Sequence, residues 1–219
     1  MRATFAEFID DPAFLGGDFA APSWDTWKIT LRAMLGEPLT DAERQRFVEV
    51  AGREPPPNRV KEAWFAIGRR GGKDSAIGAL VTYLAVCGAW QPHLARGERA
   101  TIFALAVDKS QARVLHDRVS AYFDEIPLLR DLVDSADDGV ISLKNQVDIV
   151  IAAANFRAIR GRTVAAVVMD ELAFWRDEAF ASPDVEVYRA LTPSLLTLRA
   201  AGVTAGGDLH HVPQIRLAL

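Results

Sequence analysis

Apolar residues follow two patterns along this chain. Over 74–88 and 108–123 they recur at helical spacing, which predicts helices with an apolar face. The segments 101–107, 148–153 and 164–169 are instead short, nearly continuous apolar runs, as in strands buried on both faces of a parallel sheet. Because strands and helices alternate in this order, the sequence predicts an α/β fold with a mostly parallel central sheet and helices on both faces.

A helical segment is expected in front of this sheet. Ser23 is placed to cap a helix whose apolar side carries Trp24 and Trp27. A second helix is expected over 39–51, opened by a capping box of Thr40 and Glu43, and the prolines at 55–57 end it and form a linker. The expected parts of the chain are a helical segment 1–57, a core domain 58–199 and an atypical tail 200–219.

Composition narrows the class of protein. The 219 residues, 50% hydrophobic and 25% charged, are typical of one globular domain. A single cysteine, Cys87, argues against a disulfide framework, and no apolar run approaches the roughly 18 residues of a membrane span. The net charge of −4 supplies no general attraction for nucleic acid, so such a contact needs a local patch or another domain. We expect a cytoplasmic protein without a membrane partner.

A glycine-rich stretch, AWFAIGRRGGKDS over 63–75, joins a short predicted strand to the helix 74–88. Glycines let backbone N–H groups approach an anion, the following helix points its positive end at the same place, and Lys73 adds a mobile charge. The stretch deviates from a Walker A phosphate loop, because Ile67 replaces its first glycine and Asp74 its magnesium-binding Ser or Thr. The alternative is a basic glycine turn on the surface. The residues expected to contact nucleotide are Gly68, Arg70, Gly71, Gly72, Lys73, Asp74 and Ser75.

An acidic pair, Asp170-Glu171, follows the predicted strand 164–169. Open α/β sheets bind ligands at the carboxyl ends of their strands, so the pair matches a Walker B motif. Asp170 is expected to hold magnesium, with Asp74 as a second candidate ligand, and Glu171 to position the water that attacks the γ-phosphate. The alternative is that the two carboxylates only cap the segment that follows.

Arginines supply further candidates for phosphate contact. Arg69 and Arg70 lie inside the glycine-rich stretch, and three more precede the strand 164–169. Guanidinium groups suit phosphate oxygens and stabilise phosphoryl transfer from the same chain or across a subunit boundary. Solvated surface charge is an equally open interpretation of the second group, which consists of Arg157, Arg160 and Arg162.

Five ordered stretches resemble the ATPase domain of the large subunit of tailed-phage terminases, the motors that package DNA into capsids. They are FAAPSWDTWKITLRAMLG, GRRGGKDS, VDKSQA, NFRAIRGRT and VVMDELAFW. The resemblance implies a RecA-like P-loop ATPase of a phage or prophage that hydrolyses ATP with Mg²⁺ in the cytoplasm of the bacterial host. It also implies double-stranded DNA, a portal protein and a terminase small subunit as partners, and a homo-oligomeric ring as the assembly.

The same resemblance gives roles to single residues. Lys73 is the phosphate lysine and Arg69 the cis arginine of the Walker A, Asp170 is the magnesium aspartate, and Glu171 is the hydrolytic glutamate. On the adenine side the resemblance places Trp24 and Trp27.

The sequence departs from that family at two places. Asp74 puts a carboxylate where a neutral hydroxyl is expected, and the family's coupling strand and nuclease domain are not recognisable after about residue 199. We therefore expect a truncated chain whose tail 200–219 is frame-shifted or disordered, and a sheet that lacks a strand beside 164–169. Two alternatives stay open. They are another, helicase-like nucleic-acid ATPase and a non-catalytic remnant that folds and binds nucleotide or subunits.

Overall fold

The computed structural model describes residues 2–68, 70–137, 139–153, 161–172 and 175 and the strand 215–218. Its helices are α1 Phe5–Asp10, α2 Asp25–Leu35, α3 Asp41–Ala51, α4 Lys73–Cys87, α5 Lys109–Glu125 and α6 Pro127–Arg130, with the 3₁₀ turns η1 Pro22–Trp24 and η2 Gln91–His93. Its strands are β1 Glu62–Trp64, β2 Ala100–Ala106, β3 Val133–Asp137, β4 Val140–Leu143, β5 Val147–Ala153, β6 Thr163–Met169 and β7 Ile215–Ala218. No described helix is long and apolar enough to cross a membrane.

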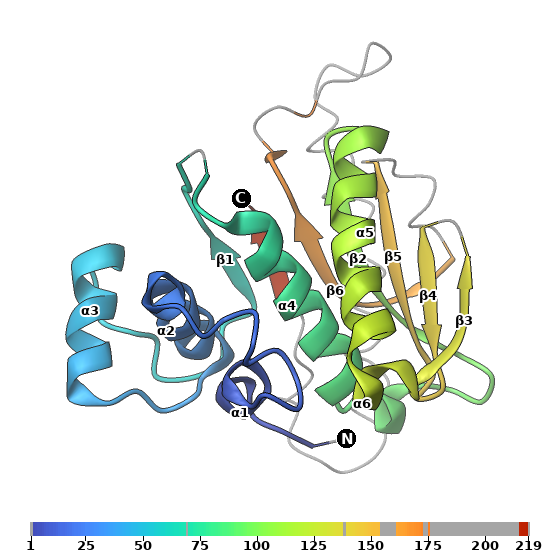
Figure 1. Cartoon of the computed structure of the whole chain (residues 1–219), viewed down its shortest axis with the longest axis horizontal. Helices are drawn as coiled ribbons and strands as arrows, with labels where there is room; N and C mark the ends of the chain where they lie inside the picture. The colour runs from blue at the N-terminus through green and yellow to red at the C-terminus, as the bar shows by residue number, and fades with distance from the viewer. Residues whose placement is uncertain are drawn as a thin grey trace.

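A seven-stranded sheet forms the centre of the fold, in the order β1-β7-β6-β2-β5-β4-β3 (Figure 1). The first five strands of that order pair in parallel, and β4 pairs antiparallel with both β5 and β3. The predicted α/β fold class with a mostly parallel central sheet is confirmed. Because β1, β7 and β6 run in parallel, their carboxyl ends meet at one edge of the sheet.

The two faces of the sheet are buried against different side chains. In β2, Ile102 and Ala104 belong to the core under α4 and α5, whereas Phe103 and Leu105 belong to a second core that includes Trp175. This alternation follows from the two-residue period of a strand, and every β2 residue is buried. The described helices α4 and α5 cover one face, so the expectation of helices on the other face depends on residues outside the described ones.

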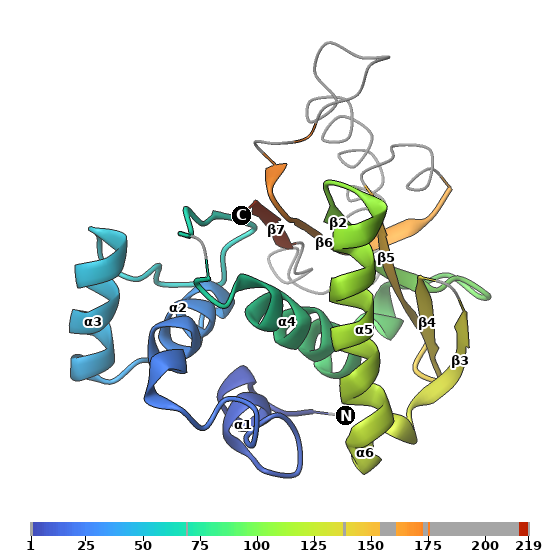
Figure 2. The same cartoon turned by 45° about the horizontal axis from the view of Figure 1, so that its top comes forward.

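Helix α4 is apolar around almost its whole circumference, because it is covered on more than one side. It contacts β2, β5 and β6 below it, and α1 and α5 beside it. In Figures 1 and 2 it lies between α5 and the N-terminal helices. A helix fixed in this way holds its first residue, Lys73, at a defined place above the sheet edge.

Of the two helix caps predicted for the N-terminal segment, the structure confirms one and contradicts the other. Thr40 and Glu43 form the capping box at the start of α3. The expectation that Ser23 caps a helix is wrong, because residues 22–24 form the turn η1 and α2 begins at Asp25 without a side-chain cap. Proline at the first position of η1 pre-sets that tight turn.

The expectation of a missing strand beside β6 is also wrong. β7 lies between β1 and β6 and pairs in parallel with both, with Arg216 opposite Glu62 on one side and Val167 on the other. Backbone pairing needs only an extended segment whose N–H and C=O groups meet those of its neighbours, so no family signature is required. Residues 200–214 lie outside the described residues, and the frame-shifted tail stays a prediction.

Candidate functional site

The predicted phosphate loop and the predicted acidic pair meet at the carboxyl edge of the sheet. The loop follows β1 and leads into α4, so Lys73 is the first helical residue. The acidic pair follows β6, two positions along the sheet from β1. Segments about a hundred residues apart in sequence are thereby brought to one place, as open α/β sheets do with ligand-binding groups.

Three charged side chains form the centre of this site. The Nζ atom of Lys73 lies 2.7 and 2.9 Å from the two carboxylate oxygens of Asp170 and 2.8 Å from Oε1 of Glu171. Asp74 is more distant, with Oδ1 3.9 Å from the same nitrogen. We call Lys73, Asp74, Asp170 and Glu171 the charged cluster.

The charged cluster is short of positive charge, since one ammonium faces three carboxylates. Burial raises the pKa of Asp170, the neighbouring charges of Asp74 and Glu171 raise it further, and Lys73 opposes the shift. Burial alone lowers the pKa of Lys73, but its hydrogen bonds to Asp170 and Glu171 outweigh burial, so the pKa of Lys73 is raised. Both shifts favour additional positive charge at this place, whether as a proton or as a cation.

Backbone contacts fix the acidic pair. The N–H of Asp170 donates to the carbonyl of Leu105 in β2 at 2.8 Å, and the indole N–H of Trp175 donates to the carbonyl of Asp170 at 2.8 Å. Glu171 takes a left-handed backbone conformation with φ 52°, which costs a non-glycine residue about 1 kcal/mol. The strand therefore ends in a sharp turn that directs both carboxylates to Lys73.

The glycine-rich loop is held by two tryptophans of the N-terminal segment. The indole N–H of Trp27 donates to the carbonyl of Gly71 at 2.7 Å. Gly72 has φ 76°, and a Cβ atom on it would lie 2.7 Å from the ring of Trp24. The predicted place of these tryptophans beside adenine stays a prediction, and their contact with the loop is a feature that sequence reasoning missed.

The other predicted nucleotide contacts are spread around the loop. Gly71 N–H donates to the Gly68 carbonyl at 3.1 Å, which closes a turn, and Arg70 within it has φ 63°. Gly68 and Arg70 are exposed, whereas Ser75 in the first turn of α4 is half-buried.

The arginines are not all placed by the structure. Arg162 directly precedes β6, so the length of that strand, about 25 Å, separates it from Asp170. Arg162 therefore does not reach the charged cluster of its own chain. Of the candidate arginines, Arg69, Arg157 and Arg160 lie outside the described residues.

The donor set of the charged cluster fits magnesium. Mg²⁺ prefers oxygen ligands and is usually held by one or two carboxylates together with water and substrate phosphates. Asp170 offers two carboxylate oxygens, and Asp74 offers further oxygens near the same ammonium. Within the described part of the chain, no group of three or more His, Cys, Asp and Glu side chains forms a metal site by itself.

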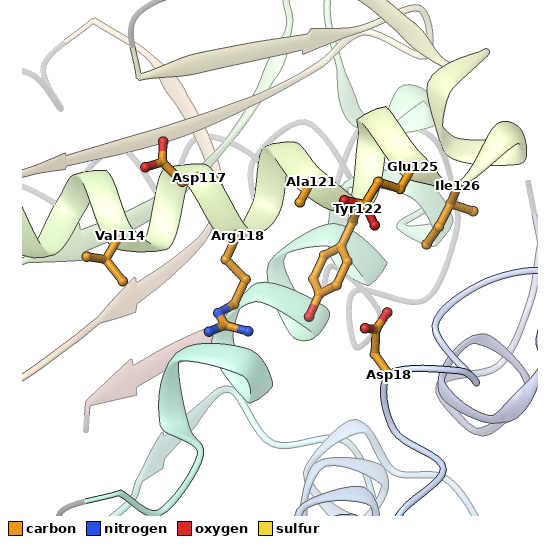
Figure 3. Close-up of a pocket in the computed structure, with 8 residues that line it drawn as sticks. All are labelled: Asp18, Val114, Asp117, Arg118, Ala121, Tyr122, Glu125 and Ile126. Atoms are coloured by element: carbon orange, nitrogen blue, oxygen red, sulfur yellow. The ribbon is translucent and has the colours of Figure 1, made fainter.

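A separate hollow of about 380 Å³ runs along α5 (Figure 3). Its lining includes Asp18, Arg118 and Tyr122, and the Tyr122 hydroxyl points toward the other two. Burial and Asp18 raise the pKa of Tyr122 to about 12, against the effect of Arg118. The residues that line this hollow include no predicted site residue, so it is distinct from the charged cluster.

The fold is similar to that of part of a phage large terminase. The structure of the HK97 bacteriophage large terminase is similar over 90% of this chain and 37% of its own length, with a TM-score of 0.52 and 17% identity. Two structures of the Thermus phage P74-26 large terminase ATPase domain, one of them a mutant, each match 82% of this chain. The matched regions are 69% and 68% of those two chains, with TM-scores of 0.47 and 0.45 and identities of 14% and 15%. No family model matches the sequence, and no curated protein does.

Proposed function

We propose that this chain is the ATPase motor domain of a phage large terminase, a Mg²⁺-dependent ATP hydrolase that drives the packaging of viral DNA. The observation that carries the proposal is the charged cluster, in which Lys73 Nζ lies within 2.9 Å of both Asp170 and Glu171. A lysine at a helix start and two carboxylates at a strand end are the groups that nucleotide hydrolysis on this kind of fold needs. The similarity to the HK97 protein supports the fold on which the proposal rests.

Each part of the site has its own role in the proposed hydrolysis of ATP. The loop N–H groups and the start of α4 bind phosphate oxygens, and Lys73 exchanges its carboxylate partners for the outer phosphates. The Glu171 side chain is 32% exposed and that of Asp170 is 8% exposed, so water reaches Glu171 more easily. Glu171 therefore holds and polarises the attacking water. Asp170 is the metal ligand and Asp74 a second oxygen donor beside it. Bound Mg²⁺ neutralises charge on the transferred phosphoryl group.

The packaging motor needs more than this domain. The chain spans 37% of the HK97 large terminase, so the activity of a whole packaging protein is part of the proposal. The partners we propose are double-stranded DNA, a portal protein and a small subunit, with the motor assembled as a homo-oligomeric ring. Arg69, or an arginine from a neighbouring subunit, would supply the charge that stabilises phosphoryl transfer.

A second candidate function is nucleotide binding without turnover. Asp74 favours it, because a carboxylate stands at the position of a neutral metal-binding hydroxyl and adds negative charge beside the phosphates. This candidate shares the binding site and differs only in the chemical step.

Two substitutions test the proposal. Lys73→Ala is expected to abolish ATP binding measured by calorimetry, and Glu171→Gln to retain binding but hydrolyse ATP at least about a hundredfold more slowly. Lys28→Ala is the control, since it removes a lysine whose ion pair, with Asp10 at 2.6 Å, lies in the N-terminal segment. Equal ATP affinity for Lys73→Ala and the control would show that the site is misplaced. A wild-type protein that binds ATP without turnover would establish the second candidate.

A further inference from the structure

The two tryptophans reach the phosphate loop from one helix and the turn before it. Trp27, in the first turn of α2, is only 9% exposed, and its indole N–H donates to the Gly71 carbonyl at 2.7 Å. Trp24, at the end of η1, presents its ring to the Cα of Gly72 so closely that even a methyl group there would collide. One tryptophan therefore holds the loop by a hydrogen bond and the other by contact.

A second layer of aromatic rings supports both indoles. The ring centroids of Phe19 and Trp24 are 4.8 Å apart, and those of Phe65 and Trp27 are 5.9 Å apart. Phe65 itself follows β1 directly. Tryptophan rings packed in this way have few alternative rotamers, so the loop is braced by a stiff support.

The hydrogen bond from Trp27 determines which way the loop's N–H groups point. In a trans peptide the C=O and the following N–H point in opposite directions. Because the Gly71 carbonyl is held toward Trp27, the N–H of Gly72 in the same peptide unit is turned away from α2. An N–H that is turned away from α2, directly before the first turn of α4, is free of the tryptophan side of the loop and suits an anion bound at the start of the helix.

We propose that Trp27 is a positioning residue for the phosphate loop, supported by Trp24, and that neither tryptophan recognises the base. The role rests on the proposed nucleotide site and deepens it. Its consequence is that Trp27 contributes to affinity for the phosphates of any nucleotide, whereas a base contact contributes to affinity for ATP alone.

Trp27→Phe tests this role, because it keeps an aromatic ring and removes the N–H. Trp90→Phe is the matched control, since the buried Trp90 donates its indole N–H to the Leu84 carbonyl at 2.8 Å near the other end of α4. Calorimetry with Mg-ATP and with inorganic tripolyphosphate provides the readout. Trp27→Phe is expected to lower the affinity for both ligands by about two- to tenfold, which corresponds to the loss of one hydrogen bond. Trp90→Phe is expected to leave both affinities unchanged. Thermal unfolding is expected to show a similar loss of stability for both variants.

The results separate the possible roles. A loss of ATP affinity with unchanged tripolyphosphate affinity would overturn the proposal in favour of a base contact. Equal affinities for Trp27→Phe and Trp90→Phe would overturn it in favour of a structural role. A wild-type protein that binds neither ligand would refute the nucleotide site itself and the positioning role with it. If Trp27→Phe does not fold, Trp24→Leu, which removes the ring against Gly72 but keeps apolar volume, is held to the same criteria.

Discussion

The charged cluster predicts unequal effects on stability for substitutions at two residues that are in contact, Lys73 and Asp170. Lys73→Ala removes the cation and leaves the buried carboxylate of Asp170 facing the negative charges of Asp74 and Glu171. Asp170→Asn instead removes the buried charge, keeps the shape, and leaves Lys73 paired with Glu171. The first change isolates a buried charge, and the second removes one.

The expected loss of stability in Lys73→Ala follows from the burial of the ion pair. Removing one partner of a buried ion pair costs about 3–5 kcal/mol. The Lys73 side chain is 22% exposed, so we expect the lower end, about 3 kcal/mol, or a fall in Tm of roughly 6–12 °C for a domain of this size. Asp170→Asn is expected to change stability by less than about 1 kcal/mol, in either direction.

The pH dependence has a definite sign. Because burial first of all raises the pKa of Asp170, the folded protein binds this proton more tightly than the unfolded chain. The contribution of Asp170 to stability is therefore present at low pH and lost as the pH rises through the window above the ordinary value of 3.8. Asp170→Asn is expected to flatten this part of the profile, and the cost of Lys73→Ala is expected to shrink as the pH falls.

Urea unfolding of the ligand-free protein at several pH values measures these effects. Asp148→Asn is the control, because Asp148 is a similarly buried carboxylate that accepts hydrogen bonds from Arg99 Nε at 2.7 Å and Ser142 Oγ at 2.9 Å. That carboxylate has a structural role, and its loss is expected to cost about 1–3 kcal/mol. If Asp170→Asn destabilised the protein as much as Asp148→Asn, the reasoning about an excess of negative charge in the cluster would be refuted.

Three further predictions use single substitutions or one reagent. Gly72→Ala is expected to cost at least about 1–2 kcal/mol in urea unfolding, from its positive φ and the Trp24 ring, whereas Gly17→Ala, with no atom near its Cβ, is not; equal costs would contradict the packing described. Asp74→Ser is expected to make ATP binding less dependent on Mg²⁺, because a negative charge beside the phosphates is lost, and identical magnesium titrations would show that Asp74 points away from the metal. Burial raises the pKa of Cys87 to about 11, two units above its ordinary value of 9.0, so iodoacetamide at pH 8 is expected to label native protein about a hundredfold more slowly than urea-unfolded protein. Equal labelling rates would show an accessible, unperturbed thiol.

Sequence reasoning was most accurate where the signal is local. The apolar runs at 101–107, 148–153 and 164–169 differ by one residue at most per end from β2, β5 and β6, because burial on both faces requires continuous apolar side chains. The capping box at Thr40 also depends on neighbours within one turn. Such patterns need no knowledge of the tertiary structure.

Contacts between distant segments were less predictable. The hydrogen bond from Trp27 joins residues 44 positions apart, and helical spacing places Trp27 on an apolar face without indicating its N–H partner. The meeting of Lys73 with Asp170 and Glu171 followed only from the rule that parallel strands gather ligand groups at their carboxyl ends. The place of β7 had no comparable signal, since its four residues match no motif.

β7 matters to the site because it sets the distance between the two halves. Adjacent strands are about 4.8 Å apart, so one strand between β1 and β6 holds them about 10 Å apart. The loop after β1 and the acidic pair after β6 are then separated by a gap that the Lys73 side chain bridges to reach Asp170 at 2.7 Å. Direct pairing of β1 with β6 would halve the distance between the two strands that carry the loop and the acidic pair. The short strand β7 thus sets the spacing of the two strands whose carboxyl ends lead to Lys73 and to Asp170.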